Sequence, residues 1–125
     1  MNDKRNMLRE KSFAFAVRIV NLYKHLTTNK MEYVLSKQLL RSGTSIGANV
    51  REAQNAESHA DFIHKLSIAQ KETDETLYWL ELLSETDFLS EAEFISIQND
   101  ASELMKIIRS IILTMKANKN ESNNS

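Results

Sequence analysis

The chain has no cysteine and no proline, and its 125 residues include only two glycines, Gly43 and Gly47. The absence of cysteine excludes a disulfide framework, a thiolate metal site and a cysteine nucleophile. An all-β fold relies on tight turns that favour proline and glycine, so this composition argues against one. No apolar run approaches the roughly 20 residues that cross a bilayer, and no apolar signal core follows the charged N-terminus. These absences predict a cytoplasmic protein that does not associate with a membrane.

The sequence does contain enough apolar residues for one helical core. Hydrophobic residues make up 42% of the chain, which argues against disorder, and the length suits one domain. Apolar residues recur with the helical period over four segments, at about 7–26, 30–55, 59–85 and 91–117. The short breaks between these segments force neighbouring helices to run antiparallel. We expect an all-α protein with one domain over residues 1–125, a single antiparallel up-down-up-down four-helix bundle with a disordered polar tail at 118–125.

The apolar stripes predict which residues face the core. In the first segment the stripe consists of Leu8, Phe15, Ile19, Leu22 and Leu26, and we expect Phe13, Val17 and Val20 to widen it. The last segment alternates spacings of three and four without a fault, through Phe94, Ile97, Ala101, Leu104, Ile108, Ile111 and Met115. This is the a/d heptad pattern of packed helices.

Two helix starts carry a capping-box pattern. Ser58 precedes Asp61 by three residues, and Ser90 precedes Glu93 by the same spacing. A serine hydroxyl at such a position accepts a hydrogen bond from the backbone N–H three residues later. The third and fourth helices are therefore expected to begin directly after Ser58 and Ser90.

The charge of the chain is unevenly distributed, although its net value is only −1. Residues 1–56 carry ten basic and four acidic side chains, whereas residues 57–103 carry two basic and twelve acidic ones. One interpretation is that these are solvated helix faces. The other is self-association, in which a basic face of one copy meets an acidic face of the next in a head-to-tail contact that closes into a ring.

The middle of the second segment, RSGTSIGAN at residues 41–49, has low helix propensity but keeps the apolar stripe in phase. We expect a helix there, in which each glycine costs about 1 kcal/mol relative to alanine and packing offsets that cost. Small residues four apart allow another helix to approach closely, within the subunit or between subunits. A polar stripe beside the core consists of Gln38, Ser42, Ser45 and Asn49, and hydrogen bonds between helices are the expected role of its buried members.

No residue pattern predicts catalysis, a cofactor or a metal. His59, Asp61 and His64 lie close together, but a di-iron bundle needs Glu-x-x-His on two helices and a glutamate on each of the other two. The acidic residues after Glu72 have no basic or nucleophilic partner placed by sequence, and no nucleophile elbow is present. We expect a protein that is not an enzyme and has no small-molecule substrate.

Two further groups of residues leave alternatives open. Tyr78 and Trp79 are either core residues or an aromatic anchor at an oligomer interface. The basic residues of the first half of the chain are candidates for phosphate contacts with nucleic acid, and they comprise Lys4, Arg5, Arg9, Lys11, Arg18, Arg41 and Arg51. A sequence pI near 6.3 weighs against strong binding of this kind, because dedicated nucleic-acid-binding domains usually exceed about 9.

The stretch LLRSGTSIGANVRE at residues 39–52 resembles the signature of a family of four-helix bundle proteins first noticed in intervening sequences of bacterial 23S rRNA genes. The family pattern is Arg-Ser-x-x-Ser-Ile-x-x-Asn-Ile-x-Glu, with Val50 here in place of the second isoleucine. The segments EKSFAFAVRIVNLYKHL and DFIHKLSIAQKETDETLYWLELL are also similar to the family. We interpret the motif as a packing or oligomer-interface element, made of Arg41, Ser42, Gly43, Ser45, Ile46, Gly47, Asn49 and Glu52.

The resemblance implies a homo-oligomer, specifically a homo-pentamer around a central opening. It also implies kinship with accessory proteins of diversity-generating retroelements, which are basic pentamers that bind a reverse transcriptase and nucleic acid. Two functions therefore remain open: an oligomeric scaffold or interaction module, and an accessory factor that binds structured RNA or a nucleic-acid-handling protein. The direction of the basic side chains separates them. Basic residues converging on one face favour nucleic acid, and basic residues paired with acids of the third helix across a subunit interface favour the scaffold.

Overall fold

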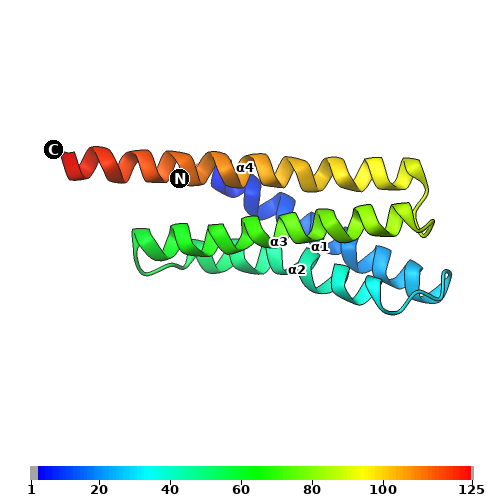
Figure 1. The fold of residues 1–125 in the computed structure, drawn as a ribbon. Helices are drawn as coiled ribbons and strands as arrows, with labels where there is room; N and C mark the ends of the chain where they lie inside the picture. The colour runs from blue at the N-terminus through cyan, green and yellow to red at the C-terminus, as the bar shows by residue number, and fades with distance from the viewer. Residues whose placement is uncertain (1–2, 125) are drawn as a thin grey trace.

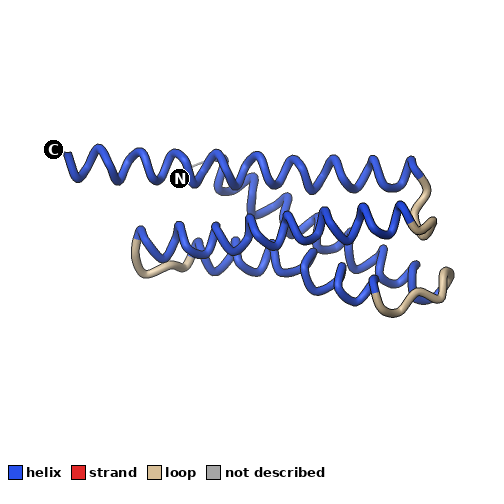
Figure 2. The backbone as a smooth tube through the Cα atoms, in the orientation of Figure 1, coloured by secondary structure: helices blue, strands red, loops and turns tan. Residues whose placement is uncertain are grey.

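The computed structural model describes residues 3–124, and side chains as far as residue 118, as four helices joined by three short connections (Figure 1). The helices are α1 (Asp3–Thr28), α2 (Leu35–Gln54), α3 (His59–Glu85) and α4 (Glu91–Asn124). Figure 2 shows that the connections are the non-helical parts of the described chain. In the described residues, no helix is both long and apolar enough to cross a membrane.

Each helix packs against two neighbours, so the bundle has a square arrangement. Helix α1 contacts α2 and α4, and α3 contacts the same two helices from the opposite corner. Successive helices run in opposite directions (Figure 1). The predicted all-α, up-down-up-down four-helix bundle is therefore confirmed, and its short connections are the reason that sequence neighbours are also neighbours in space.

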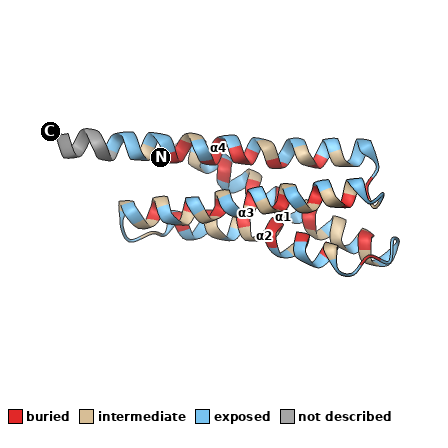
Figure 3. Ribbon diagram, viewed as in Figure 1, coloured by how far each residue is buried: buried red, intermediate tan, exposed pale blue. Residues whose placement is uncertain are grey.

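The core lies along the inward sides of all four helices (Figure 3). The heptad pattern of α4 correctly predicted the buried residues Ile97, Ala101, Leu104, Ile108 and Ile111. The low-propensity stretch at 41–49 is helical, as expected, with Ile46 fully buried. The Ser90–Glu93 capping box is formed, with reciprocal bonds of 2.8 and 3.1 Å, and at the start of α3 Ser58 Oγ accepts from the Asp61 N–H at 3.0 Å, which is the serine half of the box.

Helix α2 begins at Leu35 rather than near residue 30, and Glu32 explains the difference. Met31 adopts a positive φ of 55°, which ends any continuous helical path from α1. The Glu32 carboxylate then accepts hydrogen bonds from the N–H groups of Val34, Leu35 and Ser36, at 3.1, 2.8 and 2.7 Å. These groups have no partner within a helix that starts here, so the buried carboxylate caps α2 in place of the residue directly before it.

Helix α4 continues past the expected end near residue 117 and is helical through Asn124. It projects beyond the other helices at its C-terminal end (Figure 1). The sequence there contains neither proline nor glycine, so no residue forces the helix to stop. Ser125, the last residue of the expected tail, lies outside the described residues.

The expectation that Phe13 and Val17 widen the core stripe of α1 is wrong. Phe13 is 55% exposed and Val17 is 47% exposed, whereas Phe15 is buried. A separation of two residues corresponds to about 200° around a helix, so Phe13 and Phe15 point to opposite sides. Helix α1 therefore carries a second apolar stripe that faces away from the core.

Candidate interaction surface on helices α1 and α2

The family-like motif of α2 brings this helix close to α1 within the subunit. A Cβ atom added to Gly43 would lie 2.8 Å from Ile19 Cγ1, which is closer than carbon atoms pack. A Cβ added to Gly47 would lie 3.3 Å from the Ser12 carbonyl oxygen on the same helix α1. Both glycines thus lie where α1 and α2 approach most closely, with Gly43 buried and Gly47 partly exposed.

The polar residues of the motif bond mainly within α2. Ser42 accepts a hydrogen bond from Thr76 of α3 at 3.0 Å, in the buried interface between the two helices. Ser45 and Asn49 instead donate to backbone carbonyls one turn earlier in α2, at 2.6 and 2.9 Å. The expected bonding between helices therefore applies to Ser42, and the other two follow the local pattern typical of these residue types in helices.

The charged ends of the motif pair with α3. Arg41 bonds to Glu72 at 3.2 Å and also to Glu75, both on α3. Glu52, about three helical turns further along α2, lies 3.8 Å from Lys65 of α3. These pairs hold α2 against α3 within one subunit, so Arg41 is engaged and does not project as a free cation.

The edge of α1 that faces α4 carries three paired basic residues at intervals of seven. Lys4 donates to Ser110 at 2.6 Å, Lys11 pairs with Glu103 at 3.0 Å, and Arg18 pairs with Asp100 at 2.7 Å and also bonds to Ser96. An interval of seven residues is two helical turns, so the three side chains lie in one line. We call this line of contacts the α1/α4 ladder.

The opposite edge of α1, beside α2, is different. Three adjoining hollows of about 270, 310 and 330 Å³ run along it, and all three are lined by Arg9 and Arg51. The Arg51 guanidinium lies over the exposed ring of Phe13, 5.2 Å from its centroid. Within the described residues, neither guanidinium forms a hydrogen bond or an ion pair. We call this surface, which Ala16 and Ala48 also line, the α1/α2 groove.

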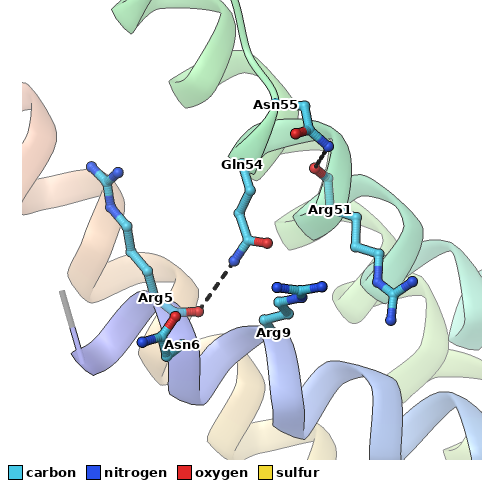
Figure 4. A pocket seen from close by; sticks show the side chains of 6 residues that line it. All are labelled: Arg5, Asn6, Arg9, Arg51, Gln54 and Asn55. Atoms are coloured by element: carbon cyan, nitrogen blue, oxygen red, sulfur yellow. Dashed lines mark hydrogen bonds between the residues drawn. The ribbon is translucent and has the colours of Figure 1, made fainter. Parts of the chain in front are cut away.

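Figure 4 shows the end of the groove that is lined by Arg5, Asn6, Arg9, Arg51, Gln54 and Asn55. The Gln54 amide donates to the Arg5 carbonyl, which joins α2 to α1 at this end. The Arg5 side chain itself points away from Arg9 and Arg51 (Figure 4). Its guanidinium lies 4.3 Å above the centroid of the Phe62 ring and donates to Met115 Sδ, while its Nε is buried without a hydrogen-bond partner in the described part of the chain.

Of the seven basic residues predicted as nucleic-acid contacts, the structure therefore brings two together with free charged groups. Arg9 and Arg51 lie on one surface. Lys4, Lys11 and Arg18 belong to the ladder, Arg41 belongs to the α2–α3 contact, and Arg5 packs on Phe62. The composition of the first half of the chain did not reveal this division, because it depends on which side of α1 each residue occupies.

Helix α3 has an exposed acidic line on its outward side. Asp74, Tyr78, Glu81 and Glu85 recur every three or four residues and are all exposed, with Tyr78 at 56%. The three carboxylates have no hydrogen bond or ion pair with other described residues. Trp79 is half-buried against the core and meets the Tyr78 ring edge-on at 5.0 Å. Trp79 thus fits the core interpretation, and the exposed Tyr78 stays a candidate anchor; we call the exposed line the α3 outer stripe.

The candidate histidines do not gather into a ligand set. His59 bonds to the Met115 carbonyl at 3.0 Å, Asp61 is part of the α3 cap, and His64 is exposed. Among the side chains that the structure describes, no group of three or more ligating residues could hold a metal ion.

Among the described side chains, two carboxyl groups have displaced pKa values, and both cap helices. Burial by itself would raise the pKa of Glu32, but the hydrogen bonds from Ser36, Leu35 and Val34 outweigh it and lower the pKa below its ordinary value. The pKa of Glu93 is lowered chiefly by the backbone and side-chain hydrogen bonds of Ser90. The sequence pattern did not predict Glu32 as a cap, because it lies three residues before the first residue of α2, outside the usual cap position.

Comparisons with known proteins agree with this architecture. The model of a family described as 23S rRNA-intervening sequence protein matches residues 4–110. The chain is also similar to a crystal structure described as a protein with unknown function from the S23 ribosomal protein family of Bacteroides thetaiotaomicron. The two share 58% sequence identity with a TM-score of 0.87, over 87% of this chain and 97% of that one. No curated protein matches the chain.

Proposed function

The chain belongs to the family of 23S rRNA-intervening sequence proteins, and from that premise we propose that it is a non-enzymatic, homo-oligomeric scaffold or interaction module of the cytoplasm. We further propose that the assembly is a pentamer. The number five comes from the family resemblance. The self-association rests on the distribution of charged and apolar residues over the surface of the subunit.

One observation carries the proposal: the α1/α2 groove combines exposed apolar side chains with arginines that the subunit itself leaves unpaired. Arginine and aromatic residues are enriched at protein interfaces, where apolar contact and charge pairing act together. Four other basic residues of the first half are already engaged within the subunit, three in the α1/α4 ladder and one at Arg41. A surface that differs in this way from the rest of the molecule is suited to binding another protein.

The non-enzymatic part of the proposal is supported by how the polar interior is used. The carboxyls with displaced pKa values cap helices, and the buried hydroxyls of Ser42 and Thr76 bond to each other. A catalytic acid or base is typically a group whose pKa has been moved toward neutrality in a cleft. Here the pKa values of Glu32 and Glu93 are lowered, away from neutrality, by the hydrogen bonds with which these carboxylates cap their helices.

Mass measurement in solution tests the proposal directly. We expect native mass spectrometry and light scattering on the purified protein to give five times the chain mass of 14.4 kDa. The dissociation of such an assembly on dilution would give the affinity of the contact. A single chain mass at every concentration would overturn the oligomeric proposal, and a stable assembly with a different number of copies would overturn the pentamer alone.

A second candidate function is nucleic-acid binding, alone or beside a reverse transcriptase or another nucleic-acid-handling protein. Arg9 and Arg51 beside the exposed Phe13 favour it, since arginine binds phosphate and an aromatic face can stack on a base. Binding of labelled structured RNA and of random-sequence duplex DNA across a salt series tests it. Tight binding that falls steeply with salt would support this function, whereas no binding at low salt would count against it.

A further inference from the structure

We propose that the α1/α2 groove of one copy receives the α3 outer stripe of a second copy in a head-to-tail contact. This inference rests on the proposed self-association and names the two surfaces that carry it. The groove supplies two cations, Arg9 and Arg51, and exposed apolar groups from Phe13 and Ala48, and the acidic Glu10 also lines one of its hollows. The stripe supplies three carboxylates and one exposed aromatic ring, from Asp74, Glu81, Glu85 and Tyr78.

The two surfaces are complementary in charge and in chemical type. Each carries ionised groups that have no ion-pair partner among the described residues of its own subunit, although the same subunit pairs Arg41, Lys11 and Arg18. Contact between the surfaces would pair arginine with carboxylate, which favours bidentate geometry. It would also cover Phe13 with the Tyr78 ring, and the cation of Arg51 already lies on such an aromatic face.

The groove and the stripe lie on different sides of the bundle, so the two copies use different patches in this contact. Helix α3 occupies the corner diagonal to α1, and its outer stripe points away from the core residues Phe62, Leu66 and Ala69. The groove lies on another side, between α1 and α2. A contact between unlike patches is heterologous, so it propagates from copy to copy and closes into a ring when the rotation allows.

The contact also requires an offset along the helices. Arg51 lies near the level of Lys65 on α3, because Lys65 pairs with the adjacent Glu52. The stripe from Asp74 to Glu85 begins about nine residues further along α3, and its centre lies about 14 residues from the level of Arg51. At 1.5 Å per residue, the two surfaces are therefore offset by roughly 20 Å along the bundle. Neighbouring copies must therefore be staggered, and in a closed ring their long axes must be inclined to the ring axis.

Charge-reversal variants on each surface test the contact. The groove variant is Arg9→Glu with Arg51→Glu, and the stripe variant is Glu81→Lys with Glu85→Lys. A matched control, Lys106→Glu with Arg109→Glu, makes the same change of charge as the groove variant at exposed positions of α4. We expect both test variants to raise the concentration for half-assembly by at least about 100-fold, because like charges would face each other, while the control assembles normally. Circular dichroism should show the same helix content in all of them.

Mixing the two test variants gives the decisive result. The groove variant keeps an intact stripe and the stripe variant keeps an intact groove, and the reversed groove and reversed stripe again carry opposite charges, so an equimolar mixture can form contacts that neither variant forms alone. We expect native mass spectrometry to detect mixed assemblies that contain both variants, whereas each variant alone stays monomeric at the same concentration. Either variant assembling like the wild type, or a mixture that remains monomeric, would overturn this contact while the proposed self-association stands.

The same variants separate this contact from the alternatives. A wild type that is monomeric at all concentrations would overturn both the contact and the proposed function. If that monomer bound labelled RNA and the groove variant lost the binding, the groove would be a nucleic-acid site instead. If the wild-type assembly bound RNA and the groove variant bound it equally well, the groove would remain the site of the second copy. The RNA would then bind at another surface.

Discussion

The two edges of helix α1 use basic residues in opposite ways. Along the edge toward α4, Lys4, Lys11 and Arg18 each contact a polar partner on that helix. Along the edge toward α2, Arg9 lies in an open groove with Arg51 and forms no ion pair within the described residues. Lys11 and Arg9 are only two residues apart, yet one is engaged inside the subunit and the other is available to a partner.

The difference shows that the spacing of charges along a helix matters more than their number. An interval of seven keeps the ladder residues in line with partners on α4 that recur at the same interval, Ser96, Glu103 and Ser110. Arg9 is out of phase with that line and emerges on the side of Phe13. A count of basic residues in the first half of the chain treats all of them alike and therefore overestimates the basic surface that is free.

The largest expected effect comes from disrupting the close approach of α2 to α1 at Gly43. In Gly43→Leu, the new side chain would collide with Ile19 and push α1 away from α2, which breaks the distinction between the two edges. We expect a loss of about 3 kcal/mol in the free energy of unfolding, at the upper end of the usual cost of overpacking a core site. Thermal and urea unfolding followed by circular dichroism would measure it.

The exposed Gln38 on the same helix provides the matched control, because Gln38→Leu introduces the same side chain outside the core. We expect that variant to unfold within about 0.5 kcal/mol of the wild type. Equal stability of Gly43→Leu and the wild type would show that α1 and α2 do not need the glycine.

A smaller effect is expected at the start of α2, the helix that carries Arg51 in its last turn. Glu32→Gln keeps the shape of the cap but removes the charge that accepts three backbone N–H groups. We expect a loss of about 1–2 kcal/mol near neutral pH, typical of a lost helix cap. Urea unfolding would measure this loss, with the exposed Glu57→Gln as control.

The pH dependence of this effect follows from the lowered pKa of Glu32. A carboxyl with a lowered pKa in the folded state contributes its stability above its ordinary value of 4.5 and loses it as the pH falls toward the folded value. The gap between wild type and Glu32→Gln should therefore be full near pH 6 and shrink below about pH 4.5. A gap that widened in acid would contradict the cap.

The smallest effect is expected from the ladder, and it sharpens the comparison of the two edges. Lys11→Ala and Arg18→Ala each remove an exposed ion pair with α4, and such pairs contribute about 0.2–1 kcal/mol. We expect a correspondingly small fall in stability that vanishes in high salt, with no change in oligomer mass. A loss of assembly in either variant would mean that the edge toward α4 also contacts a partner.

The sequence was sufficient to predict the bundle, its topology and most of its core, because apolar periodicity reports burial directly. The ends of α3 agree with the predicted range, since Ser58 provides a recognisable cap. The start of α2 was misplaced because its cap, Glu32, acts across a loop from an unusual position. Periodicity could have separated Phe13 from Phe15, but an exposed aromatic beside a core stripe is easily assigned to the core.

The candidate site was less predictable than the fold for a related reason. Periodicity indicates which side of a helix faces the core, but it does not indicate which neighbour lies at each flank. The pairing of Arg41 with Glu72, or of Arg18 with Asp100, depends on the order of the helices around the bundle and on their vertical alignment. Both properties appear only once the four helices are assembled.

The α1/α4 ladder also limits which insertions and deletions α1 can accept. A slide of α1 by four residues along α4 would set Lys4 level with Lys106 in one direction and Lys11 level with the buried Ile107 in the other. A single inserted residue would rotate everything beyond it by about 100° and take part of the ladder out of line. Length changes in steps of seven residues preserve both the rotation and the contacts, so natural or engineered length variants of this helix are expected to differ by heptads.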